Sequence, residues 1–304
     1  MVTDMPETMN SASKGQVAIT MANLPPVAGL PSSEFGLAIG YVLGHHLLNI
    51  RDLHYGYWPE GLPVEMQNLA QAQANYTELL MSKIPQGVKT ILDVGCGVGN
   101  TARKLLDRGY KVDCVSPNGF LTSVAKQMLT GRATVFETKF QDLATDRRYD
   151  LIVFNESLLF IRPLDVAFTK ALILLNPGGH VLITDIFAVP AEDKSPIGGG
   201  HNLVEFRKTI AQHSFKQVDD IDMTDGIART FDLLDQTYRE ALQPAYHMLL
   251  TRIADKYPFL MRLVRWKFRK KMEYYEKKHF SGRRDGKNFK KYKSYRLLLF
   301  KRTG

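Results

Sequence analysis

Residues Ile91–Asn100 (ILDVGCGVGN) carry most of the information in this 304-residue chain. An apolar strand predicted at Thr90–Val94 leads into a turn that has glycines at alternate positions, where the backbone can approach a ligand closely. Those glycines are Gly95, Gly97 and Gly99. A helix predicted from Asn100 directs its N-terminal amides toward the same place. Asp93, two positions before the first glycine, would repel a pyrophosphate but suits a ligand with an ammonium or sulfonium group.

Strands and helices alternate along the chain from this turn. Strands are predicted at 90–94, 111–115, 133–137, 149–154 and 180–187, with helices between most of them. This alternation predicts an α/β fold, a doubly wound and mostly parallel sheet covered on both faces. Two later strands, 215–223 and 294–301, are separated by a helical stretch at about 227–279. The last strand is therefore expected to be antiparallel, in a sheet of seven strands with N-terminal helices and a helical insert before its last strand.

Composition shifts divide the chain into four regions. Residues 1–33 lack periodicity and are expected to be a disordered or loosely packed lead. An N-terminal helical cap that includes an aromatic segment is predicted at 34–84. The sheet and its helices occupy 85–226 and 294–304, and a basic helical insert occupies 227–293.

The overall composition excludes several classes of protein. Hydrophobic residues make up 44% and charged residues 23% of the chain, which is ordinary for a globular protein with a full core. The only cysteines, Cys96 and Cys114, exclude a disulfide scaffold and a four-thiolate zinc site, and no metal site is predicted. No apolar run reaches the ~18–20 residues of a membrane helix. The N-terminus lacks the order of a secretory signal, so a cytoplasmic location is expected.

Positive charge is concentrated near the C-terminus. Residues 252–304 hold 19 Lys and Arg against 4 Asp and Glu, whereas the whole chain has a net charge of +9. This asymmetry suggests an anionic partner: a phosphate-bearing substrate, a lipid surface or nucleic acid. The alternative is a solvated helical face that only keeps the protein in solution.

The pattern from Asp93 to Gly99 resembles the D-x-G-x-G-x-G first motif of class I S-adenosylmethionine-dependent methyltransferases. The resemblance extends over about 54–302 and includes an acidic position at Asp142, a fourth strand with its loop at 150–157, and an L-x-P-G-G-like turn at 174–179. It implies a Rossmann-like core and S-adenosylmethionine as cofactor. In this family the first motif carries the methionine part of the cofactor, and the end of the second strand binds the ribose.

The resemblance also assigns individual residues to cofactor binding. These are Tyr55, Tyr57, Trp58, Asp93, Gly95, Cys96, Gly97, Gly99, Asn100, Ser116, Asn118, Gln141, Asp142, Leu143 and Asn155. Ser116 departs from the family, which usually has Asp or Glu there because a carboxylate accepts from both ribose hydroxyls. Ser116 can accept one such bond, with help from Asn118.

An aromatic segment, His54–Trp58 (HYGYW), precedes the first strand. It resembles the H-x-G-Y-W segment of the branch that contains tocopherol and cyclopropane-fatty-acid-type methyltransferases. Aromatic rings with polar groups could close over a cofactor and attract its sulfonium. The alternative is an aromatic cluster that docks a helix.

The insert before the last strand also fits that branch, in which it walls the substrate pocket. Residues 257–280 mix aromatic and basic side chains at a spacing that allows an amphipathic helix. Such a helix could lie on anionic lipid or cap the active site. Nucleic acid is disfavoured as a partner, because no RNA-binding module is visible and Asn155–Ser157 lacks the N/D-P-P-Y/F signature of amino-group nucleic-acid enzymes.

Methyl transfer requires an aligned nucleophile, exclusion of water, and removal of a proton when the nucleophile is a hydroxyl. The candidate catalytic residues are His54, Glu156 and His201. Glu156 follows the fourth strand, and His201 follows a triple glycine in the loop after the fifth strand. Both positions belong to the carboxyl edge, where doubly wound sheets bind ligands. The alternative for His201 is a solvent-facing loop histidine.

The sequence therefore predicts methyl transfer from S-adenosylmethionine to a small, hydrophobic acceptor, with oxygen favoured over nitrogen or carbon. The first alternative is a lipid or prenyl-type acceptor at a membrane surface, guided by the basic insert 252–302, which would make a cytoplasmic protein peripherally membrane-bound. A nucleic-acid methyltransferase and a non-catalytic binding module on the same fold are the remaining alternatives.

Overall fold

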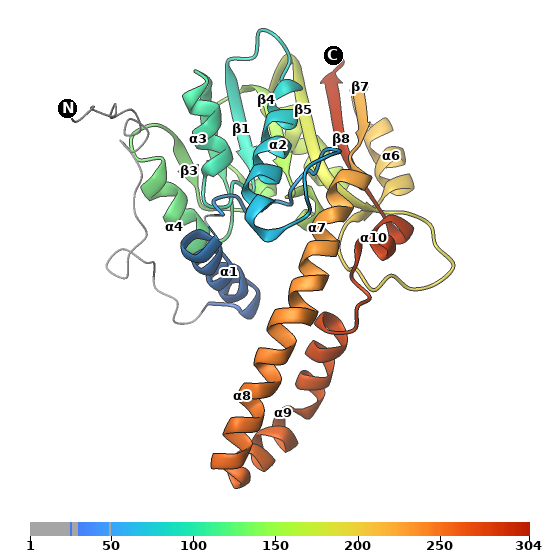
Figure 1. The fold of residues 1–304 in the computed structure, drawn as a ribbon. Helices are drawn as coiled ribbons and strands as arrows, with labels where there is room; N and C mark the ends of the chain where they lie inside the picture. The colour runs from blue at the N-terminus through green and yellow to red at the C-terminus, as the bar shows by residue number, and fades with distance from the viewer. Residues whose placement is uncertain (1–24, 26–29, 49) are drawn as a thin grey trace, which may run out of the picture.

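The computed structural model describes residues 25, 30–48 and 50–304, which form one twisted sheet covered by helices (Figure 1). The strands run in the order β3-β2-β1-β4-β5-β8-β7, and the short β6 pairs with the end of β5. Their bounds are β1 Thr90–Val94, β2 Lys111–Val115, β3 Thr134–Phe136, β4 Tyr149–Asn155, β5 Leu175–Ala188, β6 His201–Asn202, β7 Phe215–Asp222 and β8 Lys293–Arg302. Strands β1 to β5 are mutually parallel, and β8 is antiparallel to both of its neighbours. The predicted α/β architecture is confirmed, with the two-residue β6 as an addition.

Helices cover both faces of the sheet. On one face lie α2 Leu69–Ser82, α3 Asn100–Asp107, α7 Thr224–Thr237 and α10 Gly286–Tyr292, and on the other lie α5 Leu164–Leu174 and α6 Leu203–Ala211. Neighbouring residues of β1 contribute to opposite cores, Ile91 to the first and Leu92 to the second. Both faces of a parallel strand are thus apolar, which explains its continuous hydrophobic run. A third cluster joins α1 Ser32–Leu48 to α4 Gly119–Met128.

Residues 176–179, which belong to the turn expected at 174–179, are instead part of β5. Leu175 already pairs with Tyr149, and the register then shifts so that His180 pairs with Leu151. Pro177 has no N–H to donate to a neighbouring strand, and the extra residues are accommodated as a bulge rather than as a separate turn.

The insert before the last strand is not one continuous helical rod. After α7 comes a π-helical turn at Tyr238–Leu242, then α8 Gln243–Lys256 and α9 Pro258–His279. Tyr257 breaks the helix at φ −134° and ψ 65° because Pro258 disfavours the helical conformation of the residue before it. α8 and α9 therefore fold back on each other as a hairpin that projects from the body (Figure 1).

The N-terminal lead that the sequence predicts at 1–33 lies mostly outside the described residues. No helix in the described part of the chain combines the length and apolarity needed to cross a membrane.

Candidate functional site

A cavity of about 350 Å³ opens at the carboxyl edge of the sheet, beyond the ends of β1, β4 and β5. Its other walls come from α1, from the segment 52–55 and from the loop that contains Gly198 and Gly199. The cavity brings together nine of the predicted site residues: His54, Tyr55, Asp93, Gly95, Cys96, Gly97, Asn100, Asn155 and Glu156. These come from three separate parts of the chain, 54–55, 93–100 and 155–156, which the fold brings to one edge of the sheet.

The turn after β1 has the geometry that its glycines predict. Gly95 and Gly97 have φ values of 76° and 54°, in the left-handed region that favours glycine. A Cβ at Gly95 would collide with the Ser157 side chain, whose hydroxyl donates to the Val94 carbonyl. The turn is therefore held tightly against the loop after β4.

Asp93 lies at the base of the cavity and is only 1% exposed. Its Oδ2 atom is buried and has no hydrogen-bond partner among the described residues. Burial raises the pKa of this carboxyl to about 7, because nothing nearby compensates its negative charge. A buried carboxylate oxygen without a partner is costly, and a cationic or hydrogen-bond-donating ligand would remove that cost.

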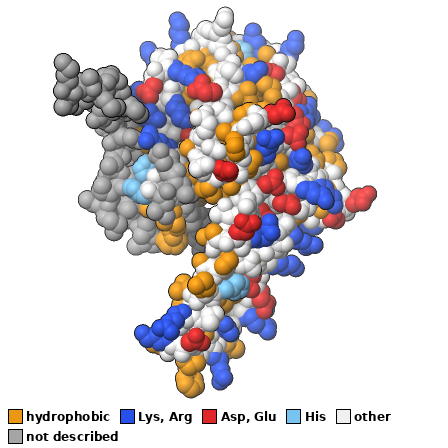
Figure 2. All heavy atoms as spheres, in the orientation of Figure 1, with side chains coloured by type: hydrophobic (Ala, Val, Ile, Leu, Met, Phe, Trp, Pro, Cys, Tyr) orange, Lys and Arg blue, Asp and Glu red, His pale blue; other side chains and the backbone are white. Residues whose placement is uncertain are grey.

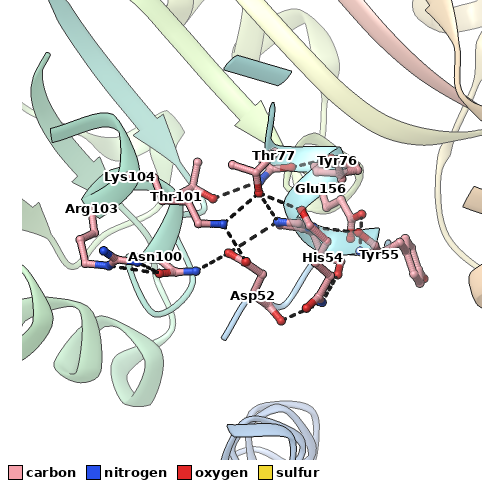
Figure 3. Close-up of polar contacts among 12 residues, drawn as sticks. Asp52, His54, Tyr55, Tyr76, Thr77, Asn100, Thr101, Arg103, Lys104 and Glu156 are labelled. Carbon is pink, nitrogen blue, oxygen red and sulfur yellow. Dashed lines mark hydrogen bonds and ion pairs between the residues drawn. The ribbon is translucent and has the colours of Figure 1, made fainter. Parts of the chain in front are cut away.

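A polar network closes the wall of the cavity beside α3 (Figure 3). Asp52 lies at its centre, with Oδ2 2.8 Å from the Lys104 Nζ atom and Oδ1 3.6 Å from Nε2 of His54. Asn100 donates its side-chain amide to the same carboxylate. Burial alone would raise the pKa of Asp52, but His54 and Lys104 together hold it well below its usual range. Asp52 is therefore ionised and helps to fix the ring of His54. That ring stacks on the ring of Tyr76, with 4.2 Å between the two ring centroids.

Glu156 follows β4 and is the only non-glycine among the described residues with a positive φ, 53°. Its Oε1 atom accepts hydrogen bonds from the Tyr55 backbone N–H at 3.0 Å and from the Tyr295 hydroxyl at 2.7 Å. Burial raises the pKa of this carboxyl, although His54, Tyr295 and Tyr55 act in the opposite direction. A strained residue that two distant segments of the chain hold in place is typical of a functional position.

The lining residues that the sequence analysis missed include three ionisable ones, Asp52, Asp185 and Tyr295. Asp185 is 1% exposed on β5, and burial raises its pKa to about 8 although the Leu159 backbone N–H donates to it. Its position near the carboxyl end of an apolar strand was a usable signal. Tyr295 lies on β8, far away in sequence, and no local pattern points to it.

The aromatic segment divides between the cavity and the core. Tyr55 lines the cavity, but Trp58 is 1% exposed and donates its indole N–H to the Thr230 hydroxyl at 2.9 Å. The Tyr57 ring packs against Gly226, where a Cβ would approach it to 2.5 Å. The prediction that Tyr57 and Trp58 bind the cofactor is corrected here, because both rings dock α7 on the body.

His201 is also not among the residues that line the cavity. It is 6% exposed on β6, and its Nε2 atom lies 2.9 Å from the Leu158 carbonyl oxygen. Burial lowers the pKa of this imidazole, which favours the neutral form. The catalytic assignment of His201 is therefore replaced by a structural one, in which its ring links β6 to the loop after β4.

The other predicted cofactor residues lie outside the cavity lining: Gly99, Ser116, Asn118, Gln141, Asp142 and Leu143. Ser116 is 5% exposed at the end of β2, and its hydroxyl accepts from the Asn118 N–H at 3.4 Å. Asn118 caps α4 by accepting from the Leu121 N–H. Gly99 precedes α3 and packs against Leu129. The ribose-binding role of Ser116 stays a prediction.

The predicted cap over the substrate pocket does not come from the hairpin. No lining residue of the cavity lies between residues 200 and 294 of the described chain, so α8 and α9 do not wall it. Other parts of the insert approach the back of Tyr55: the ring centroid of Phe231 on α7 lies 4.9 Å from that of Tyr55, and Arg284 lies beside them. α8 leads away from the sheet, and the break at Tyr257 turns the chain so that α9 runs back alongside α8 (Figure 1).

A second hollow, of about 780 Å³, lies at the opposite edge of the sheet. It is lined by the first residues of β1, β2 and β4, such as Thr90, Lys111 and Tyr149. None of the predicted site residues reaches it. Because parallel α/β sheets bind ligands at the carboxyl ends of their strands, the smaller cavity is the candidate site.

Comparisons with known proteins identify a family. A family model described as a methyltransferase domain matches residues 66–281. An uncharacterized methyltransferase of Geobacillus kaustophilus is 29% identical over 115 residues, 37% of this chain and 54% of that protein. One from Bacillus cytotoxicus is 30% identical over 121 residues, 39% of this chain and 57% of that protein. The chain thus spans little more than half the length of these curated relatives.

Solved structures share the fold. The [4+2]-cyclase SpnF is 18% identical with a TM-score of 0.61, covering 90% of this chain and 97% of that one. Geranyl diphosphate C-methyltransferase from Streptomyces coelicolor, crystallised with Mg²⁺, a geranyl diphosphate analogue and S-adenosyl-L-homocysteine, is 17% identical with a TM-score of 0.61, covering 88% and 92%. An O-methyltransferase of Brevibacillus brevis in complex with S-adenosyl-L-homocysteine is 18% identical with a TM-score of 0.58, covering 83% and 84%. A cyclase among these neighbours illustrates that one fold hosts different reactions.

Proposed function

The chain belongs to the methyltransferase-domain family, and we propose that it transfers a methyl group from S-adenosylmethionine to a small, largely hydrophobic acceptor, preferentially at oxygen. The observation that carries this proposal is the buried, unpartnered Oδ2 atom of Asp93 beside the glycine turn. When bound, S-adenosylmethionine supplies an electrophilic methyl group on a positively charged sulfur, and it also carries an ammonium group. The residues present therefore fit this cofactor.

The turn after β1 would hold the methionine part of the cofactor. Asp93 would pair with its cationic end, and the backbone at Gly95 and Gly97 leaves room for close approach. A Cβ at Gly97 would lie 3.3 Å from the Leu53 side chain and would narrow the space between the turn and segment 52–55. The start of α3 adds free backbone amides at the same place.

Glu156 is the proposed general base. An oxygen or nitrogen acceptor must lose a proton as the new bond forms, and a base is most effective when its pKa lies close to the working pH. Burial moves the pKa of Glu156 in that direction, and the bonds from Tyr55 and Tyr295 fix one carboxylate oxygen. His54 is the second candidate, but its ring is already held between Asp52 and Tyr76.

A hydrophobic acceptor is supported by the apolar part of the cavity lining. Leu53, Leu159, Phe160 and Ile186 contribute to that part. Phe160 is 79% exposed, an unusual state for a large aromatic ring, and an apolar acceptor would cover it. At the level of the fold, neighbours named as O-methyltransferase and geranyl diphosphate C-methyltransferase agree with such an acceptor.

The second candidate is a lipid or prenyl-type acceptor presented at a membrane surface. The observation in its favour is the set of exposed apolar side chains on the hairpin α8–α9, among them Phe259 and Trp266. An acceptor panel separates the two candidates, because a prenyl or acyl chain should then be methylated faster than a small phenol or carboxylic acid.

Two measurements test the proposal. Calorimetry with S-adenosyl-L-homocysteine should show binding to the wild type and a severe loss of binding in Asp93→Asn. Transfer from labelled donor to a panel of phenols, carboxylic acids, amines and prenyl alcohols should then identify the acceptor class. Absence of cofactor binding by the wild type would overturn the proposal.

The base is tested separately with Glu156→Gln, which can keep both hydrogen bonds to the side-chain oxygen. We expect kcat to fall by about 10²–10⁴ with cofactor affinity unchanged. The matched control is Glu137→Gln on the surface, where the carboxylate pairs with Lys126. A Glu156→Gln enzyme with wild-type kcat across pH would exclude Glu156 as the base.

A further inference from the structure

The hairpin α8–α9 is built as a projection with one internal seam. α8 and α9 contact each other along that seam, and Met261 on α9 is 5% exposed. The free end, around Tyr257, lies far from the sheet in Figure 1. The hairpin therefore presents most of its surface to the surroundings rather than to the rest of the chain.

The free end carries large apolar side chains that nothing in the described chain covers. Phe259 is 84% exposed, Trp266 is 78% exposed and Leu263 is 57% exposed. Their spacing of four and three residues places them on one face of α9. Met248, on α8, is 74% exposed. Contiguous exposed apolar residues with a polar rim mark interaction surfaces.

The same hairpin is strongly basic. Residues 243–279 contain ten Lys and Arg against three Asp and Glu. Among the described basic residues at 252–271, only Arg269 has a carboxylate within ion-pair distance, Glu273 at 3.8 Å. Figure 2 shows orange side chains at the free end of the hairpin, with blue ones beside them.

We propose that the free end of the hairpin α8–α9 docks on an anionic lipid surface. Phe259, Leu263 and Trp266 would enter the boundary between head groups and acyl chains, while Lys267 and its basic neighbours meet the lipid phosphates. Long basic side chains can place their stems in the apolar layer and their charges at the phosphates. This docking does not depend on which acceptor the cavity takes.

Charge distinguishes this occupant from a second copy of the chain. Two hairpins packed tip to tip would bring two strongly positive surfaces together, which repel each other. A bilayer rich in anionic lipid instead supplies negative charge and an apolar layer side by side. Such a bilayer can contact the basic side chains and the exposed apolar side chains of the hairpin at the same time.

The two tryptophans provide an intrinsic probe. Trp266 is exposed on the hairpin, whereas Trp58 is 1% exposed in the body. The 304-residue chain is mixed with vesicles of phosphatidylcholine alone or with about one-third phosphatidylglycerol. We expect the emission to shift to the blue and the protein to sediment only with the anionic vesicles. A Trp266→Phe variant should sediment but lose the shift, because Trp58 stays buried.

Charge removal gives the matched comparison. Lys267→Gln, Lys270→Gln and Lys271→Gln together should weaken binding to the anionic vesicles by about 100-fold. The control removes the same charge from three exposed lysines on the body, Lys111, Lys139 and Lys216, and should bind as the wild type does. Equal weakening in both triple variants would overturn the assignment to the hairpin.

Two further outcomes would also overturn the proposal. One is the absence of sedimentation with either kind of vesicle. The other is a blue shift that grows with protein concentration without vesicles, accompanied by dimer formation in analytical ultracentrifugation. A second copy of the chain would then cover the hairpin. Circular dichroism of each variant verifies that the helices are retained.

Discussion

Replacing Asp93 by Asn should stabilise the ligand-free protein at neutral pH while abolishing its function. The Asp93 carboxyl is buried, and its Oδ2 atom has no partner in the described chain. Its ionisation in the folded state is therefore opposed by desolvation, which no nearby charge offsets. Asn has nearly the same shape and does not ionise, so the variant escapes that cost.

The sign and the size of this change in the free energy of unfolding follow from the pKa of the Asp93 carboxyl. Burial raises it from 3.8 to about 7, so between these values the folded state binds more protons than the unfolded state. The contribution of Asp93 to stability is fully present below pH 3.8 and is lost as pH rises through about 7. At about 1.4 kcal/mol per pKa unit, the loss amounts to about 4 kcal/mol.

The assay is urea unfolding of wild type and Asp93→Asn between pH 4 and pH 8. The free energy of unfolding of the variant minus that of the wild type should increase by about 4 kcal/mol across this window and then level off. Other titrating groups cancel in this difference because both proteins contain them. An Asp146→Asn control removes an exposed carboxylate and should give a flat difference. A flat difference for Asp93→Asn would refute the reasoning.

The same pKa predicts how cofactor binding depends on pH. A cationic ligand that pairs with Asp93 binds its ionised form, so its affinity should rise about tenfold per pH unit below about 7 and then level off. Calorimetry with S-adenosyl-L-homocysteine between pH 5 and pH 8 measures this directly. A pH-independent affinity would mean that the ligand does not contact the Asp93 carboxylate.

Two further substitutions test the packing around the site by urea unfolding. Gly95→Ala should destabilise the protein by about 1–3 kcal/mol, since its positive φ disfavours a side chain and the new Cβ would collide with Ser157; an unchanged midpoint would contradict the tight turn. Thr230→Val should cost about 1–3 kcal/mol by leaving the buried N–H groups of Trp58 and Gly56 without their acceptor. Thr230→Ser keeps the hydroxyl oxygen and should therefore lose less stability than Thr230→Val. Equal losses of stability in the two variants would argue against these hydrogen bonds.

The site could be predicted from the sequence where its residues belong to one short segment. The sequence predicts site residues in the turn after β1 and at the end of β4, and the parallel sheet places Asp93, Asn155 and Glu156 at one cavity. The aromatic segment was ambiguous, since Tyr55 and Trp58 have similar chemistry and only packing separates them. One lines the cavity and the other is buried against α7.

The sequence by itself determined the order of strands and helices, the glycine turn and the basic character of the insert. These features depend on local periodicity and on residues a few positions apart, so they can be read without long-range information. Only the tertiary structure decided that Tyr295 donates a hydrogen bond to Glu156, which lies 139 positions away in the sequence. It also decided that Asp52 pairs with Lys104 and that α8 and α9 do not line the cavity. Such contacts arise when separate elements pack together, and a one-dimensional pattern carries no record of which distant side chains then meet.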